Sequence, residues 1–424
     1  MRKEILLLNI IIMLTFILTG CWDARELNTL GINLVMGIDI ENDNIIITSE
    51  VIKPSALKSK SGKGKEITVK YIQGVGKSVF EAIRNATLDF DRKLFVSHTK
   101  VYIIGEELAK KGMTDYIDFL QRDQEHRETA YLVVAKGSKA YDVMGISGGI
   151  EDIPGNYILR LIENQKYTSK ITQITLFEYL RNYYDVGRQP ILGVIEKKEK
   201  KLANKPEDTI ADKSKGAVHE ISSEGTAAFH KEKLVGYLNG EETRGLNFII
   251  GKVKDGVIAF PTPITNIDEY STPTPPSPSE AASISKAINP MSTVEIVKTK
   301  TKNDIEIVDG EIMFKTKIDL RGIVGEVIGD LDISKEEGLE VLQNACAKEI
   351  KKEVEKAFFK AQKDLKSDIF GFGTLFHRKY PKEWAKIKDN WHDIFQEANL
   401  DVEVNVNIVR TGLINVPTKR IKGK

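Results

Sequence analysis

One short apolar stretch at the N-terminus limits how this chain can fold. Residues 5–18 are mostly apolar, two basic residues precede them, and Leu18-Thr19-Gly20-Cys21 ends the stretch. This order is typical of a lipoprotein signal, in which small residues permit cleavage and the cysteine is acylated. The stretch is shorter than the roughly 20 apolar residues that cross a bilayer. The sequence therefore predicts removal of residues 1–20 and lipid attachment at Cys21.

The remainder of the chain has no second long apolar run, so we expect it to fold in water beside the membrane. An acylated Cys21 anchors such a chain, because each methylene buried in the bilayer contributes about 0.8 kcal/mol and several chains act together. The other cysteine, Cys346, then has no partner within the chain. We therefore expect no internal disulfide, although an exported chain can form one.

The charge balance argues against one class of partner. Of 62 basic and 61 acidic residues, Arg2, Lys3 and Glu4 leave with the signal, so the mature chain carries 60 of each. Nucleic-acid binding depends mainly on an excess of Lys and Arg that neutralises phosphates. We therefore expect no nucleic-acid partner.

Two changes in composition divide the mature chain. A charged stretch at 196–216 has no apolar periodicity and predicts an exposed linker. A segment rich in Pro and Ser at 261–292 lacks the backbone donors that a sheet needs and predicts a solvated insertion. These boundaries leave an N-terminal α/β domain at 21–195, a β-rich middle lobe at 217–260 and a C-terminal α/β domain at 293–420.

Local patterns predict an α+β fold of two or three mixed lobes, with antiparallel sheets, packed helices and one long helix in the C-terminal half. Leu30–Ile40 and Ile45–Ile52 read as a hairpin, and residues 248–260 as another. Residues 106–121 have apolar positions at helical spacing. The longest helical stripe covers 334–367, and Ser334 with Glu337 resembles a capping box at its start.

No segment predicts a catalytic, metal or cofactor site. Residues 145–149 match G-x-S-x-G, but the preceding segment reads as a helix, so a glycine-rich helix stop is the better interpretation. The six histidines form no H-E-x-x-H pattern. Trp384 and Trp391 are seven residues apart, which suits a helix face packed on a core better than a sugar platform. We therefore expect a non-enzymatic protein without a cofactor.

Several segments, kept in order and spacing, together resemble the Ger(x)C family of spore germination lipoproteins. They are Gly20–Leu27 (GCWDAREL), Gly76–Arg84 (GKSVFEAIR), Gly105–Ala109 (GEELA), Glu224–Phe229 (EGTAAF), Lys233–Leu238 (KLVGYL), Glu241–Leu246 (EETRGL), and Trp384 with the closing strand at 402–412. The resemblance implies the C subunit of a nutrient germinant receptor. It places the chain on the outer face of the spore inner membrane, held by lipidated Cys21 beside membrane-embedded A and B subunits.

The second half of that pattern leaves the roles of its residues open. Glu242 and Arg244 either pair across a turn or face a partner. Four glycines are expected at turns and bulges of a β-layer, because glycine alone accepts positive φ without a steric penalty. They are Gly225, Gly236, Gly240 and Gly245.

A second hypothesis is a lipid-anchored extracytoplasmic solute-binding protein, which the alternating β and α elements of the first domain allow. It predicts a deep interdomain cleft and saturable binding of a small molecule. A cell-envelope hydrolase is a third hypothesis, and no motif supports it. Which nutrient is sensed, and whether this chain contacts it, does not follow from the sequence.

Overall fold

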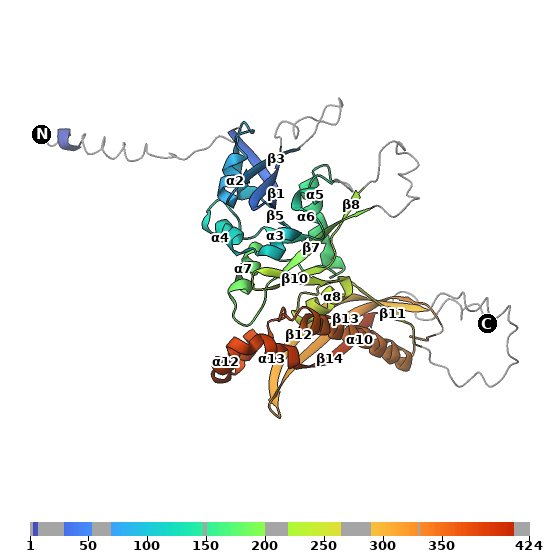
Figure 1. The fold of residues 1–424 in the computed structure, drawn as a ribbon. Coiled ribbons are helices and arrows are strands. Elements are labelled where there is room, and N and C mark those ends of the chain that lie inside the picture. The colour runs from blue at the N-terminus through green and yellow to red at the C-terminus, as the bar shows by residue number, and fades with distance from the viewer. Residues whose placement is uncertain are drawn as a thin grey trace, which may run out of the picture.

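The computed structural model describes residues 3–6, 29–52, 69–146, 151–199, 219–263, 290–329 and 331–410. These residues form two parts, each built on one sheet, with a helix between them (Figure 1). The α+β fold class is confirmed. No helix among the described residues combines the length and the apolar character that crossing a bilayer requires.

The N-terminal part contains a ten-stranded sheet in the order β10-β9-β7-β6-β5-β1-β2-β3, with β4 beside β1 and β8 beside β7. Its strands are β1 (Leu30–Glu41), β2 (Asn44–Ile52), β3 (Val69–Gly76), β4 (Lys93–Phe95), β5 (Val101–Gly105), β6 (Tyr131–Ala135), β7 (Ile191–Glu199), β8 (His219–Ser222), β9 (Thr226–His230) and β10 (Lys233–Leu238). The sheet is mixed: β1, β5, β6 and β7 are parallel, and hairpins extend both edges. The predicted hairpin at 30–52 is confirmed, and its turn has positive φ at Asn42 and Asp43.

Helices cover both faces of this sheet, which explains why β5 is buried along its whole length. One face carries α2 (Val79–Asn85), α3 (Glu106–Lys111), α4 (Thr114–Arg122) and α7 (Leu176–Tyr184). The other carries α5 (Ala140–Val143) and α6 (Pro154–Asn164). Along the central strands β5 and β6, successive side chains alternate between the two cores, as Tyr102 and Ile103 show.

The helix predicted at 106–121 is two helices. Gly112 has φ +131°, a conformation that ends α3 and that other residues rarely adopt. The predicted inward side chains Leu108, Met113, Ile117 and Leu120 are all buried.

The C-terminal part contains a four-stranded sheet in the order β11-β12-β13-β14. Its strands are β11 (Val257–Pro261), β12 (Met291–Val308), β13 (Glu311–Val327) and β14 (Asn399–Arg410). The long helix α10 (Glu336–Phe359) packs on this sheet and continues into a π-helical turn, Lys360–Asp364. Three short helices follow α10: α11 (Phe372–Lys379), α12 (Pro381–Ile387) and α13 (Trp391–Glu397), with a 3-10 turn at Lys388–Asn390. Helix α8 (Gly240–Ile249) lies between the two parts, and the N-terminal part has 3-10 turns at Val96–His98 and Gln165–Tyr167.

An aromatic cluster forms the centre of this second part. The rings of Phe314 on β13 and Phe372 on α11 stack with centroids 4.1 Å apart. Trp384 and Trp391 are both buried, with centroids 5.3 Å apart. Their prediction as core residues is confirmed, but they lie on α12 and α13 rather than on one helix, because the chain turns at 388–390.

The structure differs from three further predictions. Residues 248–260 are not a hairpin: the first two residues end α8, and β11 follows. Most of α8 is buried, so its sequence lacks the polar face that marks a helix. Ser334 does not cap α10, since its hydroxyl donates to Asp332 and the cap position is Lys335. Residues 217–260 form no lobe of their own, because β9 pairs with β7 and extends the large sheet.

Two predicted connecting segments lie mostly outside the described residues. Of the charged stretch 196–216, residues 196–199 belong to β7, and 200–218 are not described. Of the segment 261–292, only its ends are described, in β11 and in the start of β12.

Asp39 at the end of β1 links the large sheet to α5. Its carboxylate accepts hydrogen bonds from the backbone N–H groups of Ala140 (2.7 Å) and Tyr141 (3.3 Å). A Cβ atom at Gly105 would lie 2.0 Å from this carboxylate, so only glycine fits there. Burial is the largest influence on Asp39 and raises its pKa to about 6.

We predict that Asp39 makes stability depend on pH. A carboxyl whose pKa is raised on folding stabilises the fold below its ordinary pKa, and this contribution is lost as the pH rises through about 6. Relative to Asp39→Asn, the wild type should lose roughly 2 kcal/mol of unfolding free energy between about pH 4 and pH 7, measured by urea unfolding. Exposed Asp91→Asn is the matched control, and equal pH profiles for wild type and Asp39→Asn would contradict the prediction.

Candidate functional site

The segment Gly76–Arg84 builds a tight turn from β3 into α2. A Cβ atom at Gly76 would lie 2.6 Å from the backbone nitrogen of Ala82, so glycine lets the helix approach the strand. Ser78 caps the helix by accepting from the N–H of Glu81 (3.2 Å), and Glu81 accepts from the N–H of Lys77 (2.6 Å). This geometry buries one side of α2 on the sheet and turns Phe80 and Arg84 outward.

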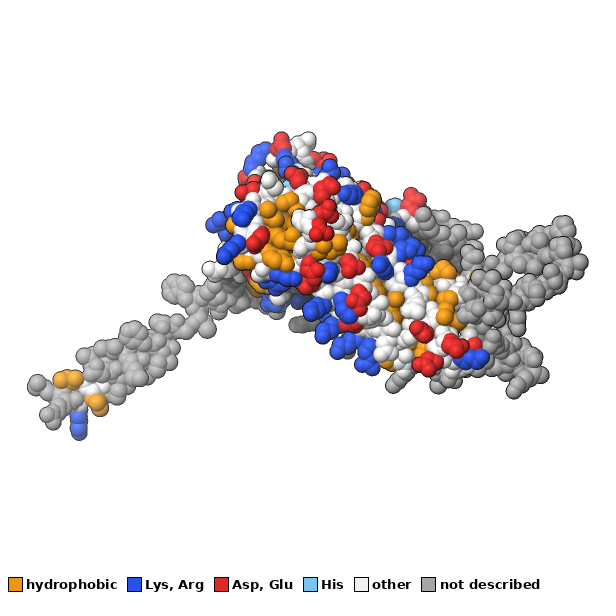
Figure 2. Space-filling model, turned by 90° about the horizontal axis from the view of Figure 1, so that it is seen from below, with side chains coloured by type: hydrophobic (Ala, Val, Ile, Leu, Met, Phe, Trp, Pro, Cys, Tyr) orange, Lys and Arg blue, Asp and Glu red, His pale blue; other side chains and the backbone are white. Residues whose placement is uncertain are grey.

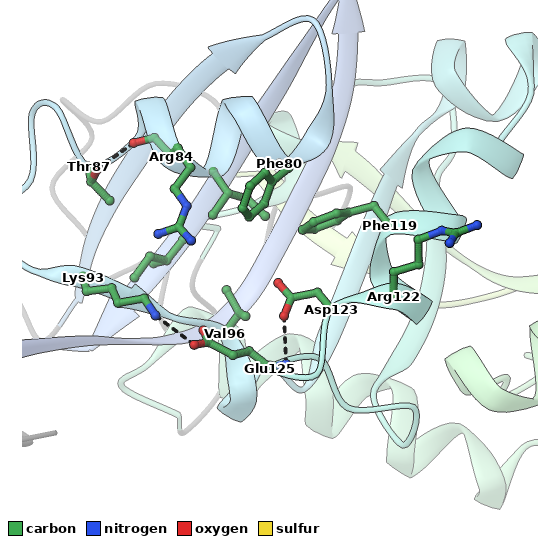
Figure 3. Close-up of a pocket in the computed structure, with 11 residues that line it drawn as sticks. Phe80, Arg84, Thr87, Lys93, Val96, Phe119, Arg122, Asp123 and Glu125 are labelled. Atoms are coloured by element: carbon green, nitrogen blue, oxygen red, sulfur yellow. Dashed lines mark hydrogen bonds and ion pairs between the residues drawn. The ribbon is translucent and has the colours of Figure 1, made fainter. Parts of the chain in front are cut away.

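The outward side chains of α2 form one wall of a cavity of about 430 Å³ (Figure 3). The facing wall comes from α4, where Phe119 lies 5.5 Å from the ring of Phe80. The guanidinium of Arg84 lies 4.9 Å from the centroid of the Phe80 ring. The cavity is lined by Phe80, Ile83, Arg84, Thr87, Lys93, Leu94, Val96, Phe119, Arg122, Asp123 and Glu125.

Charged groups surround this aromatic pair. Lys93 and Glu125 form an ion pair of 2.8 Å, and Asp123 accepts from the N–H of Glu125 at 2.9 Å, as Figure 3 shows. Arg84 forms no ion pair with a carboxylate of the described chain. The cavity therefore offers an apolar floor and basic groups at its rim, a combination suited to binding an amphipathic surface or molecule.

His126 lies beside the cavity, with its ring 5.4 Å from that of Phe119. Its Nδ1 lies 2.6 Å from the hydroxyl of Tyr102, and burial lowers its pKa. Its Nε2 lies 3.7 Å from Asp123. Thr87, which alone among the lining residues carries a hydroxyl, donates it to the backbone carbonyl of Arg84 at 2.6 Å rather than to a base.

Metal ligation finds no support in the described part of the chain. No group of three or more His, Cys, Asp or Glu side chains there could hold an ion. His230 and His392 approach each other with ring centroids 4.6 Å apart, but they form a pair without a third ligand. On the face that Figure 2 shows, basic and acidic side chains are intermixed, with apolar side chains exposed between them.

Cys21, the predicted lipid attachment site, lies outside the described residues. Cys346 is buried on α10, and burial raises the pKa of its thiol to about 12. It forms no disulfide in the structure. Its position on the apolar side of the helix is that of a packing residue.

Arg244 is buried and faces neither a turn nor a partner. Its Nε donates to Glu353 on α10 at 2.8 Å, a second bond joins its Nη2 to the same carboxylate, and its Nη1 donates to the carbonyl of Val257 at 2.8 Å. Glu242 forms a capping box with Asn239 at the start of α8. The two residues therefore do not pair across a turn, and burial keeps Arg244 off any partner surface; contact of Glu242 with a partner stays a prediction.

The four glycines of the same region divide into two kinds. Gly225 (φ +111°) and Gly236 (φ +153°) have the positive φ expected of turns and bulges, and the register shifts at Gly236. Gly240 and Gly245 instead lie in α8. A Cβ atom at Gly245 would lie 2.1 Å from the carbonyl oxygen of Glu353, so this glycine allows close contact between α8 and α10.

Asp368 is a buried carboxylate that accepts several hydrogen bonds, and no pattern in the sequence singled it out. Its carboxylate accepts from the backbone N–H groups of Gly371 (2.9 Å) and Gly373 (2.8 Å) and from the indole Nε1 of Trp391 (3.0 Å). Beside it, Arg188 from the loop before β7 donates to the carbonyl of Phe370 at 2.6 Å. These bonds tie the N-terminal part to the short helices of the C-terminal part.

Two further cavities are more polar in character. One of about 400 Å³ lies beside α8, where Lys136, Glu196 and Glu224 contribute charge. Another of about 500 Å³ lies where α7 and α8 approach, and Lys252 there donates to Glu178 (2.7 Å) and to the carbonyl of Gln173 (2.7 Å). The charged groups named here are satisfied by the protein itself or lie at the surface.

Two family models match this chain. One, described as a spore germination protein N-terminal domain, matches residues 23–197, and one described as spore germination B3/GerAC like, C-terminal, matches residues 224–412. The chain belongs to the Ger(x)C family of spore germination proteins.

Individual relatives match over almost their whole length. Spore germination protein KC of Bacillus subtilis (strain 168) is 28% identical, with 99% of this chain and 98% of the relative covered. Spore germination protein B3 of the same organism is 26% identical, with 94% and 95% covered. The crystal structure of the GerBC protein has 23% identity, a TM-score of 0.49, and coverage of 88% of this chain and 96% of that chain.

We predict that the buried pair between Arg244 and Glu353 is more important for stability than exposed ion pairs. Glu353→Gln leaves the Arg244 charge buried without its partner, which should cost about 3–5 kcal/mol of unfolding free energy. Glu403→Gln, which breaks the exposed pair with Lys317, is the control and should leave the urea midpoint unchanged.

The double variant Arg244→Met/Glu353→Leu separates charge from packing. Because it leaves neither charge buried, it should regain part of the stability that Glu353→Gln loses. A Glu353→Gln midpoint equal to that of Glu403→Gln would show that the buried pair does not have this role.

Proposed function

We propose that this chain is a lipid-anchored, non-enzymatic subunit of a germinant receptor, required for nutrient-triggered spore germination. It acts on the outer face of the spore inner membrane with membrane-embedded A and B subunits. The observation that carries the proposal is the family match over residues 23–197 and 224–412, which is nearly the whole mature chain.

The geometry is consistent with a binding subunit. The cavity between α2 and α4 combines two aromatic rings with Arg84 and Lys93 at its rim, and no nucleophile and base meet there. The buried pair of Arg244 with Glu353 and the bond from Arg188 to the carbonyl of Phe370 hold the two parts of the molecule to each other. Such a body presents fixed surfaces to its partners, which lowers the ordering cost of binding.

Acylation of Cys21 explains how a weak contact could be sufficient for assembly. Confining the chain to the membrane raises its effective concentration toward membrane-embedded partners without any new contact. The signal-like segment that ends at Cys21 is the sequence observation behind this part of the proposal.

The solute-binding alternative gains no specific support. It calls for a deep cleft between the two parts, whereas α8 lies between them with most of its residues buried (Figure 1). The cavity of about 500 Å³ near α7 and α8 has Lys252 bonded to Glu178 and to the backbone. Saturable binding of a nutrient by the isolated mature chain would revive this alternative.

Germination of mutant spores tests the proposal. We expect a deletion of this chain to abolish nutrient-triggered release of dipicolinic acid for particular nutrients, with other germination routes intact. Cys21→Ala should remove the chain from the inner membrane and reproduce the deletion. The control is germination by a route that bypasses nutrient receptors, which both strains should retain.

The opposite results separate the parts of the proposal. A normal response of the deletion strain to every nutrient would contradict the receptor role. Full germination by a Cys21→Ala chain that has left the membrane would contradict the role of the anchor alone.

A further inference from the structure

Exposed apolar side chains lie near the start of β1, the first strand of the large sheet. Leu30, at the start of β1, pairs with Lys93 of β4, and Lys93 lines the cavity that contains Phe80. Phe80 is 47% exposed. Leu88, in the turn after α2, is 79% exposed, more than any other large apolar side chain that the structure describes. The backbone N–H of Leu88 donates to the carbonyl of Asn85 (3.0 Å), which fixes this turn.

The chain length before β1 limits how far this end can be from the bilayer. Leu30 follows Cys21 by nine residues, which span at most about 30 Å when fully extended. A compact chain of this size has a radius of gyration of about 22 Å, so its full width exceeds that reach. If Cys21 is acylated, the end of the molecule at the start of β1 therefore lies nearest the membrane.

The rest of the molecule extends away from this end. In Figure 1 the start of β1 and helix α2 lie at the top of the N-terminal part, and the turn between β12 and β13 projects from the bottom of the C-terminal part. That turn also exposes an apolar side chain, since Val308 is 45% exposed. Val308 therefore serves as a control for Leu88, because it is an exposed apolar side chain at the opposite end of the molecule.

The side chains around Leu88 have the chemistry of a bilayer interface. Leucine and phenylalanine enter the boundary between headgroups and acyl chains, and long basic side chains lie along them with their charge among the headgroups. Arg84, over the ring of Phe80, and Lys93 provide such basic side chains. Glu81, Asp89 and Asp91 offset much of the positive charge, so the apolar side chains carry the contact.

We propose that Leu88 and Phe80, with Arg84 and Lys93 beside them, form a membrane-contact surface that enters the headgroup region of the bilayer. The proposal rests on the lipid anchoring at Cys21 proposed above. The lipid and this surface then act as two attachments, which fix the orientation of the chain on the membrane as well as its location. In this proposal, the headgroup region of the bilayer, and not a protein or a small molecule, contacts the rim of the cavity.

Depth-dependent quenching tests the contact directly. The full lipidated chain carries one bimane label at Leu88→Cys or at Val308→Cys, in vesicles of phosphatidylethanolamine and phosphatidylglycerol with nitroxide-labelled headgroups. Cys346 does not compete for the label, because it is buried and its thiol pKa is raised to about 12. We expect several-fold stronger quenching at Leu88→Cys than at Val308→Cys. Equal quenching at the two positions would overturn the proposal.

A binding measurement supplies a second, independent variant. The mature chain with Cys21→Ser, which carries no lipid, should bind the same vesicles weakly, and Leu88→Asp should reduce this binding by about fivefold. Val308→Asp should leave it unchanged. Because the apolar side chains carry the contact, replacing phosphatidylglycerol by phosphatidylcholine should change binding less than Leu88→Asp does. No difference between Leu88→Asp and Val308→Asp would contradict the membrane contact.

The outcomes distinguish this inference from the proposed function. A chain without an acyl group in mass spectrometry of spore membranes would overturn the anchoring on which both rest. An acylated, membrane-bound chain whose Leu88→Cys label is not quenched would overturn the contact surface alone. A label that lipid quenchers reach only weakly, and that becomes shielded when the A and B subunits are added, would assign this surface to a protein partner instead of the bilayer.

Discussion

The buried ion pair between Arg244 and Glu353 fixes how the two sheets of this protein are joined. Arg244 lies on α8, which follows the last strand of the large sheet, and Glu353 lies on α10, which packs on the small sheet. Both side chains are almost fully buried, so either charge alone would be costly. The bidentate geometry and the further bond to Val257 allow few other positions of α8 relative to α10.

The contacts around this pair depend on the same close approach. Gly245 allows the backbones of α8 and α10 to come near enough for the pair to form. A second contact between the two parts lies at the turn into α11. Asp368 accepts hydrogen bonds within this turn, and Arg188, from the loop before β7, donates to the carbonyl of Phe370 there. Two polar contacts, far apart in the sequence, therefore hold the parts as one body, and the buried apolar side chains between them form a continuous core.

Local patterns predicted much of the fold but not the contact between α8 and α10 that joins the two sheets. The hairpin of β1 and β2 and the long helix α10 were predictable because their periods are local. Helix α8 was not, because it is buried on most sides and its residues show no amphipathic period. Glu353 and Asp368 look like ordinary surface carboxylates in the sequence, and only the fold brings Arg244 and Trp391 to them. Pairing over such sequence separations carries no local signal.

The candidate site could have been found in part. Phe80 is apolar at a position that the spacing of Val79, Ala82 and Ala86 places off the buried side of α2, and an apolar residue on a polar face is a signal for an interaction. Its partner Phe119 gave no such signal, because α4 belongs to a different segment and meets α2 only in the folded chain. The sequence also predicted Cys21 without indicating which end of the body lies near it.

A rigid body on a short tether has few orientations on a membrane. The reach from Cys21 to Leu30, at most about 30 Å, is shorter than the width of the protein, so the proposed acylation of Cys21 would keep one end near the lipid. The cavity between α2 and α4 lies at that end, through the pairing of β1 with β4. Since the buried contacts of Arg244 and Arg188 hold the second sheet in place, the orientation of the first sheet would also set the height of the second above the membrane. In the proposed receptor, the contact between α8 and α10, the lipid at Cys21 and the exposed apolar side chains together determine which surfaces a membrane-embedded partner can reach.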